Sequence, residues 1–275
     1  MFGLSKLVAD FDSYTLDNLP RSIIIVGKEG SGKHVLTNYI SSKFNLVQKD
    51  ISQELSEELV DSIYRSTSLG LYLIDLRKIT NNDQNILLKL FEEPPANSFI
   101  TLLANNTSSI LPTILNRGKI FTIENYTTEE LSNFAKYKNI DINPSYFGNV
   151  IETPGDILKI YSNNINLSSI EDLVDKIINK LNLASYSNTL SILDKLNYND
   201  EYDKIDVDFF LKLLKFKSIY SYINDHNEDA LNIFNITITD IKKLNDTRLN
   251  KKLLVTNLLT KLWVEVRHGV KWFKN

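Results

Sequence analysis

The chain has 275 residues, of which 43% are hydrophobic and 24% are charged, a length and composition that favour two or three folding units of a soluble globular protein. It contains no cysteine, which excludes disulfides, thiolate zinc sites and thiol nucleophiles and fits a reducing compartment such as the cytoplasm. No apolar run is long enough for a membrane span, and the net charge of -3 restricts any DNA contact to a local patch.

Short apolar segments rich in β-branched residues predict strands at residues 22–26, 71–75, 99–104 and 119–123. Helical spacing predicts helices between them, over residues 33–43, 53–64 and 83–91. Such alternation indicates βαβ units with right-handed crossovers, and therefore a parallel sheet covered by helices. We predict an α/β core over residues 1–126.

The remainder of the chain is predicted to be helical. Residues 127–165 open on a helix start, Thr127-Thr128-Glu129-Glu130, and a further helical piece follows Pro144. From residue 166 to 275 apolar residues recur at intervals of three and four, as in Ile170, Val174 and Ile177. This spacing predicts an all-α bundle of about five helices.

A phosphate-binding loop is predicted directly after the first strand, where it opens a helix. Glycines allow backbone N–H groups to turn toward phosphate oxygens, and the helix N-terminus adds its dipole. The residues expected to bind nucleotide here are Gly27, Glu29, Gly30, Ser31, Gly32, Lys33 and His34. The alternative is a glycine-rich turn that binds nothing. His34 stands where a Ser or Thr hydroxyl would bind Mg²⁺, so coordination of that ion is doubtful.

Residues 81–118 contain a second pattern: a Gln-Asn-x-Leu-Leu-Lys helix, Glu-Glu-Pro-Pro, a strand ending in Asn, and a Pro-Thr-Ile-Leu-x-Arg element. This block resembles clamp-loader subunits of the AAA+ superfamily, especially the bacterial DNA polymerase III delta-prime type. The residues in register are Gln84, Asn85, Leu87, Leu88, Lys89, Glu92, Glu93, Pro94, Pro95, Asn105, Pro112, Thr113, Ile114, Leu115 and Arg117. The resemblance spans nearly the whole chain and is strongest over residues 22–118. It implies a nucleotide-binding core, a small helical lid over 127–165 and an oligomerisation collar over 166–275.

Asp75 ends an apolar strand where the family has its Walker B acid, which orients a metal-bound water. In the hydrolysing members the next residue is a glutamate that polarises the attacking water, but here it is Leu76. Leucine cannot accept a proton, so Leu76 and His34 together predict weak or absent hydrolysis. Asp75 is equally well explained as a strand-end residue that caps a neighbouring turn.

Two further positions take their predicted roles from the resemblance. Asn105 matches the family's sensor residue, which hydrogen-bonds the γ-phosphate or its water, although a polar exit from a strand explains it equally well. Arg117 matches an arginine that points into the nucleotide site of the next subunit, where a guanidinium suits the developing phosphoryl charge. The alternative for Arg117 is an ordinary surface residue.

The lid and the DNA-binding face complete the comparison. Residues 153–159 resemble the family's Gly-x-x-Arg helix, but Leu158 occupies the arginine position and Lys159 lies beside it. The lid is therefore predicted to offer no γ-phosphate ligand, and the family's zinc module is absent. The helix at residues 82–91 is the candidate DNA-facing element, through Gln84 and Lys89, against the alternative of a solvated face that touches nothing.

These features predict a clamp-loader subunit that hydrolyses ATP weakly or not at all, binds ATP or ADP, and supplies Arg117 to a neighbour. The resemblance implies a heteromeric ring of loader subunits, a sliding clamp and primed DNA as partners, in a phage or a bacterium. Two other functions remain open. One is an AAA+ subunit that hydrolyses ATP at its own site, and the other is a stand-alone DNA-binding or recombination accessory protein.

Overall fold

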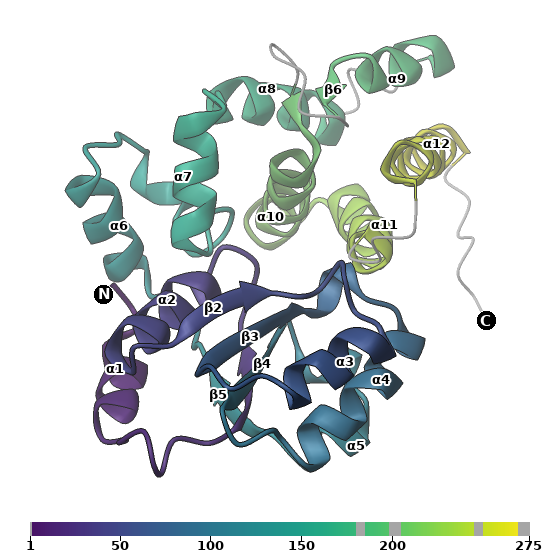
Figure 1. Cartoon of the computed structure of the whole chain (residues 1–275). Coiled ribbons are helices and arrows are strands. Elements are labelled where there is room, and N and C mark those ends of the chain that lie inside the picture. Colours follow the sequence, from purple (N-terminus) through teal and green to yellow (C-terminus); the bar gives the residue numbers. More distant parts are fainter. Residues whose placement is uncertain (1, 180–184, 198–204, 245–249, 269–275) are drawn as a thin grey trace. The chain divides into compact units, whose positions relative to one another are not determined.

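A computed structural model describes residues 2–179, 185–197, 205–244 and 250–268 (Figure 1). The chain divides into two compact units, Met1–Asp141 with Glu152–Ile157 and Ile142–Ile151 with Leu158–Asn275. The division of the sequence into core, lid and collar stays a prediction.

The first unit is built on a sheet of five parallel strands, which confirms the predicted α/β class. The strands are β1 (Ser22–Val26), β2 (Val47–Asp50), β3 (Gly70–Asp75), β4 (Ser98–Ala104) and β5 (Lys119–Thr122), in the spatial order β2-β3-β4-β1-β5. The chain passes from β1 to the far edge, returns through β3 and β4, and crosses β1 to reach β5. The carboxyl ends of β1, β4 and β3 are therefore neighbours, and ligands of open α/β sheets bind at such an edge.

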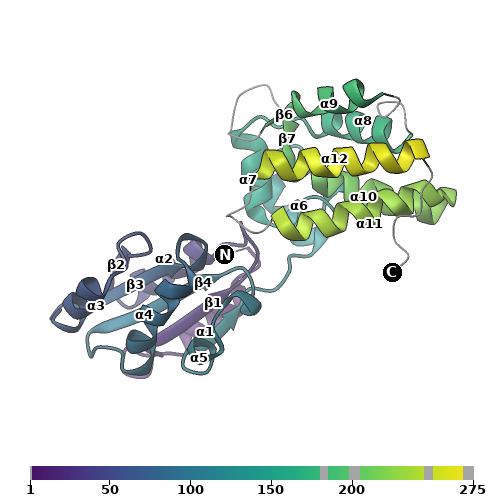
Figure 2. The same ribbon diagram turned by 90° about the vertical axis from the view of Figure 1, so that its right-hand side faces the viewer.

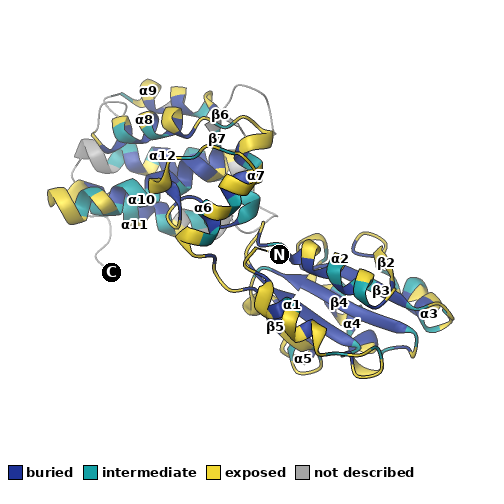
Figure 3. Cartoon of the chain, turned by 90° about the vertical axis from the view of Figure 1, so that its left-hand side faces the viewer, coloured by how far each residue is buried: buried dark blue, intermediate teal, exposed yellow. Residues whose placement is uncertain are grey.

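Helices cover both faces of this sheet, as the apolar strands require. Every residue of β1 and β4 is buried, and Figure 3 shows β4 in dark blue. The helices α3 (Glu57–Tyr64), α4 (Asn81–Glu92) and α5 (Pro112–Leu115) pack around Ile24, Ile74 and Leu102 on one face. The helices α1 (Ser5–Asp12) and α2 (Lys33–Lys43) lie on the other face (Figure 1). The core is thus a three-layer sandwich.

Two elements of this unit escaped prediction, and one helix begins later than expected. The strand β2 is the polar tetrapeptide Val-Gln-Lys-Asp, exposed along its whole length at the sheet edge, so it carries no apolar signal. The helix α1 was not predicted either. The helix α3 begins after Ser56, whose side chain accepts a hydrogen bond from the Leu59 N–H, and not at Gln53.

Shorter elements lie between the strands of the sheet and after its last strand. They include the 3-10 turns Leu76–Lys78 and Thr107–Ser109, the helix α6 (Thr128–Tyr137), the 3-10 turn Pro144–Tyr146 and the helix α7 (Pro154–Ser162). As predicted, α6 begins at Thr127, which forms a capping box with Glu130.

The second unit is a helical bundle, as predicted. Its described residues form α8 (Leu167–Ile178), α9 (Tyr186–Leu193), α10 (Val207–Asp225), α11 (Glu228–Leu244) and α12 (Lys251–His268). The helices α10, α11 and α12 lie side by side (Figure 2). The predicted apolar positions are buried, including Ile170, Val174 and Ile177 of α8. Two short parallel strands, β6 (Leu196–Asn197) and β7 (Ile205–Asp206), were not predicted. Among the described residues, no helix is long and apolar enough to cross a membrane.

Candidate functional site

The predicted phosphate loop lies at the carboxyl edge of the sheet, between β1 and α2. The Gly27 N–H donates to the Ala104 carbonyl at 3.0 Å, which joins the start of the loop to the end of β4. Gly30 and Gly32 have φ angles of +73° and +96°, a left-handed conformation that favours glycine. Gly32 is the N-cap of α2, so the loop ends in the unpaired N–H groups of a helix start.

Lys33 is buried, with 6% of its surface exposed, and its ammonium group is directed back into the loop. It donates to the carbonyls of Gly27 and Lys28 and, at 2.9 Å, to Oδ1 of Asn105. The structure therefore brings together Lys33 and Asn105, both predicted site residues that lie far apart in the sequence. Burial and the nearby Arg77 guanidinium lower the pKa of Lys33 to about 8.

Asp75 also lies at this edge, where its carboxylate forms an ion pair with Arg77. The Arg77 Nη2 lies 2.7 Å from Asp75 Oδ2, and the Arg77 Nε lies 3.1 Å from Oδ1 and 3.2 Å from Oδ2. The Arg77 backbone N–H also donates to Oδ1, at 3.0 Å. A carboxylate offers about four acceptor positions, so the three N–H groups of this one residue engage both oxygens and occupy most of those positions.

The electrostatics of Asp75 follow from that pairing. Only 2% of Asp75 is exposed, and burial by itself would raise its pKa. The hydrogen bonds from Arg77 outweigh burial, and with smaller contributions from the charges of Arg77 and His34 they hold the pKa of Asp75 below its usual value. Asp75 is therefore an ionised partner of Arg77, and its side chain also caps the 3-10 turn after β3, as the alternative interpretation expected.

Glu29 and His34 complete the polar surroundings of the loop. Glu29 is exposed, and its Oε1 lies 2.6 Å from Nη1 of Arg77, so one guanidinium bridges the loop and the end of β3. His34 is exposed at the first turn of α2. Sequence reasoning assigned no role to Arg77, although its position directly after Leu76 was the available signal.

Ser31 lies within the loop with its hydroxyl unsatisfied. Ser31 is 2% exposed, and its Oγ has no hydrogen-bond partner. This oxygen lies 2.7 Å from the point where a Cβ of Gly27 would stand, so a side chain at Gly27 would displace it. The Ser31 carbonyl accepts a hydrogen bond from the Tyr126 hydroxyl at 2.7 Å, and burial raises the pKa of Tyr126 to about 12.

The start of α7 closes over the loop, a contact that sequence reasoning missed. The Gly155 N–H donates to the Gly30 carbonyl at 3.0 Å, and Lys28 pairs with Glu152 at 2.9 Å. A Cβ on Gly155 would stand 2.4 Å from the Gly30 Cα, which explains why glycine is needed there. The glycine in the Thr-Pro-Gly-Asp sequence was the available signal.

Farther along α7, Lys159 forms ion pairs within the second unit. Its ammonium group lies 2.8 Å from Asp206 Oδ2 and 3.4 Å from Asp208 Oδ2. Leu158, at the family's arginine position, is 43% exposed.

Arg117 lies at the amino ends of the parallel strands, whereas the phosphate loop lies at their carboxyl ends. It directly precedes β5, and in a parallel sheet the beginning of β5 is level with the beginning of β1. Its Nη2 pairs with Glu92 Oε1 at 2.7 Å, and its Nη1 donates to the Thr113 carbonyl at 2.7 Å. The Arg117 side chain is 35% exposed and that of Glu92 is 47% exposed.

The two candidate DNA-facing residues are placed differently. Gln84 is 2% exposed and holds the turn before α5, since its amide donates to the Ser109 carbonyl and accepts from the Leu111 N–H. This placement argues against the expected DNA-facing role, because no polar atom is left for an outside partner. The Lys89 side chain is 62% exposed and pairs with Asp61 at 3.0 Å, so it stays a candidate.

The site does not fit a magnesium ion. Both carboxylate oxygens of Asp75 are paired with the Arg77 guanidinium, a cation in the place of the metal, and His34 brings an imidazole where an oxygen ligand is needed. Among the described residues, no cluster of three or more His, Cys, Asp or Glu residues could hold a metal ion.

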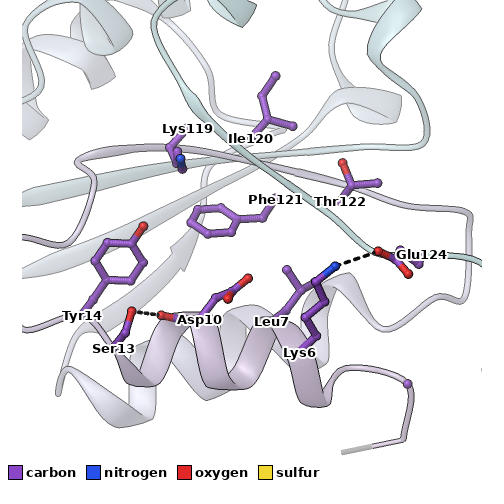
Figure 4. Close-up of a pocket in the computed structure, with 11 residues that line it drawn as sticks. Lys6, Leu7, Asp10, Ser13, Tyr14, Lys119, Ile120, Phe121, Thr122 and Glu124 are labelled. Atoms are coloured by element: carbon purple, nitrogen blue, oxygen red, sulfur yellow. Dashed lines mark hydrogen bonds and ion pairs between the residues drawn. The ribbon is translucent and has the colours of Figure 1, made fainter.

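A separate pocket of about 490 Å³ lies between α1 and β5 (Figure 4). Its lining includes Lys6, Asp10, Tyr14, Lys119 and Glu124, with Lys6 and Glu124 paired at 3.1 Å. None of the predicted nucleotide-binding residues lines it, so it is a feature distinct from the phosphate loop.

Comparison with known proteins finds a similarity over part of this unit. Residues 32–127, about a third of the chain, match the family model described as DNA polymerase III, delta subunit. This segment contains Lys33, Asp75, Asn105 and Arg117. No curated protein sequence matches the chain.

Solved structures with similar folds include two from Thermotoga maritima. A protein related to the DNA polymerase III gamma subunit has 14% identity and a TM-score of 0.47, with 95% of this chain and 98% of that chain covered. The Holliday junction branch migration motor RuvB has 14% identity and a TM-score of 0.43, with 82% of this chain and 76% of that chain covered. Similarities at this level carry no statement about activity.

Proposed function

We propose that this chain is a subunit of a sliding-clamp loader that hydrolyses ATP weakly or not at all and completes a neighbour's ATP site with Arg117. The match to the DNA polymerase III delta family over residues 32–127 supports the class of machine. The observation that carries the division of labour is the pairing of Arg77 with both carboxylate oxygens of Asp75.

The chain's own site lacks the groups that phosphoryl transfer requires. Hydrolysis needs a metal ion to neutralise developing charge and a base to orient the attacking water. Arg77 engages both carboxylate oxygens of Asp75, where a metal-bound water would have to compete with it, and His34 replaces the hydroxyl ligand. Leu76, at the position of the base, is an apolar side chain with 9% of its surface exposed. These features support binding of ATP or ADP without efficient turnover.

The position of Arg117 supports a role toward another molecule over a role at its own phosphate loop. The phosphate loop follows β1, whereas Arg117 precedes β5, which pairs with β1 in parallel register. Five residues at about 3.3 Å each put the two ends of β1 roughly 15 Å apart. A guanidinium side chain does not span that distance through a packed sheet, so Arg117 is unavailable to its own loop.

The pairing of Arg117 with Glu92 is compatible with a role in trans. Both partners are partly exposed, and exposed ion pairs contribute only about 0–1 kcal/mol. Phosphate oxygens in a neighbour's site carry more charge and accept bidentate hydrogen bonds from arginine. Glu92 therefore holds the guanidinium in place until the neighbour's nucleotide competes for it.

The wider assembly follows from the same proposal. The helices of the second unit would join this chain to other loader subunits in a heteromeric ring. The ring would open a sliding clamp and place it on primed DNA. Within the first unit, the exposed ammonium group of Lys89 on α4 is the remaining candidate for a DNA contact.

The test is reconstitution with the other clamp-loader subunits of the same replication system, followed by assay of ATP turnover. Arg117→Ala should lower turnover at the neighbouring site by a factor on the order of 10³, as loss of arginine fingers does. Arg65→Ala is the matched control, because Arg65 is a surface arginine at the end of α3. An unchanged rate for Arg117→Ala would remove this residue from the neighbour's site.

The purified chain alone separates the proposal from its rivals. With Mg²⁺ present, we expect turnover far below roughly one per second, which is the low end for enzymes. A rate near that value would identify an active ATPase. A monomer that binds DNA and ignores the loader subunits would identify an accessory protein.

A further inference from the structure

Arg77 occupies the place in the site where a divalent cation would act. Its guanidinium lies between the end of β3 and the phosphate loop, in contact with Asp75 and Glu29. The Arg77 side chain is 34% exposed, so part of it faces the opening of the site. A planar group with five N–H donors has bonds to spare after these contacts.

The charges around the loop are balanced before any ligand arrives. Lys33 and Arg77 are positive, Asp75 and Glu29 are negative, and all four interact within this small region. The two acids differ in how firmly they are held, because Asp75 is 2% exposed and the Glu29 side chain is 75% exposed. An exposed carboxylate returns to water at little cost. A phosphate group can therefore replace Glu29 at the Arg77 guanidinium while Asp75 stays in place.

The loop itself contains an unused hydrogen-bonding group. Ser31 Oγ is buried without a partner between the glycines of the loop, and a buried unpaired hydroxyl costs about 1–3 kcal/mol. The ammonium group of Lys33 is satisfied only by carbonyls of the same loop and by Asn105. Ser31 Oγ gains a partner when phosphate oxygens enter beside the start of α2, and the Lys33 ammonium group can exchange a neutral carbonyl for a charged phosphate oxygen.

We propose that the phosphate loop binds the phosphates of a nucleoside di- or triphosphate without a divalent metal ion, with Arg77 as the built-in cation. The inference rests on the part of the proposed function that assigns nucleotide binding to this loop. Asp75 then has a structural purpose: it fixes a guanidinium in the place where related sites bind a metal. The bound nucleotide would serve as a structural ligand.

The first experiment measures binding of ATP and of ADP to the full chain by calorimetry, in EDTA and in excess Mg²⁺. We expect affinities within about twofold of each other in the two conditions. Binding that is tenfold or more tighter with Mg²⁺ would overturn the inference. Absence of binding in both conditions would also overturn it, yet the role of Arg117 in the complex would remain open to its own assay.

The second experiment uses Arg77→Gln, which removes the cation and frees the Asp75 carboxylate. In EDTA this variant should bind nucleotide about tenfold or more weakly, since a hydrogen bond between charged groups is lost. Addition of Mg²⁺ should restore part of that affinity, because Asp75 can now accept a metal-bound water. Arg65→Gln is the matched control and should bind as the parent chain does.

A double variant keeps the result interpretable if Arg77→Gln leaves an unstable buried charge. Arg77→Gln with Asp75→Asn removes both partners, so no carboxylate is stranded. It should bind nucleotide weakly in EDTA and gain nothing from Mg²⁺. Affinity equal to that of the parent chain in either variant would show that Arg77 does not contact the ligand and would overturn the inference.

Discussion

Cationic side chains lie at both ends of the parallel strands, the carboxyl edge and the amino edge of the sheet, and they are held by different contacts. At the carboxyl edge, Lys33 is buried and Arg77 is fixed by a carboxylate that is itself 2% exposed. At the amino edge, Arg117 pairs with Glu92, whose side chain is 47% exposed. The first arrangement is part of the fold, whereas the second is a surface pair that a competing anion can open. The comparison suggests that this protein retains a ligand at one edge and offers a cation to a neighbour at the other.

Substitution of a glycine at each of these two edges should produce the largest difference in the free energy of unfolding. In Gly155→Ala the new Cβ would meet the backbone of Gly30 at 2.4 Å, which cannot move without shifting the loop. In Gly118→Ala it would meet Cγ1 and Cδ1 of the buried Ile24 side chain at 2.6 Å, and a side chain can shift without moving the backbone. We expect a stability loss of about 2–3 kcal/mol for the first variant and about 1 kcal/mol for the second. Hydrogen exchange of the β1 and β4 amides measures both, and equal losses would contradict the distinction.

Removal of the loop lysine should separate binding from turnover. Lys33→Ala deletes the ammonium group at the start of α2, and a hydrogen bond between charged groups corresponds to a loss of about 30-fold in nucleotide affinity. Turnover of the reconstituted complex should stay within about threefold of the parent complex, because the neighbour's site is intact. Complete loss of turnover would instead make this chain the active motor.

The pH dependence of nucleotide binding provides a third test. The pKa of Lys33 is lowered to about 8 by burial and by Arg77, so the free site loses its proton as the pH rises through 8. Binding requires the charged form, and the affinity should therefore be steady near pH 7 and fall about tenfold by pH 9. The charges of Asp75 and Glu29 oppose this lowering of the Lys33 pKa. Lys33→Arg should show a flat profile, and a flat profile for the parent chain would contradict the prediction.

The smallest effect is expected at the amino edge. Glu92→Gln removes the charge that pairs with Arg117, and an exposed pair contributes about 0–1 kcal/mol. Stability should change by less than about 1 kcal/mol, and turnover of the complex by less than about threefold. A larger fall in turnover would show that Glu92 aims the guanidinium during the reaction.

Much of the first unit could be predicted because its three central strands, β1, β3 and β4, are buried on both faces, although β5, also predicted, is largely exposed. The segments Ser22–Val26 and Ser98–Ala104 are continuous apolar runs, and helices capped by Thr80 and Thr127 begin where their side chains bond to the backbone. The exposed edge strand Val47–Asp50 carries no such pattern. A strand can be predicted from the sequence where its residues are apolar, as burial in the sheet requires.

The site was harder to predict because its decisive contacts are not local motifs. Lys33 and Asn105 were named from the sequence and do meet at 2.9 Å. The capture of Asp75 by Arg77 depends on a side-chain orientation, and the contact between Gly155 and Gly30 joins distant segments. Gln84 shows the same difficulty, since a polar residue on a helix was proposed to face DNA and its hydrogen bonds are made inside the chain.

The central claim is that Arg117 lies at a neighbour's nucleotide while this chain's own loop is dispensable for turnover. The most direct measurement is photo-crosslinking in the reconstituted complex with an ATP analogue that carries its reactive group on the γ-phosphate. The account predicts a labelled peptide from the α5–β5 turn around Arg117, and that label persists in Lys33→Ala. Labelling confined to residues 27–34, and lost in Lys33→Ala, would contradict the account.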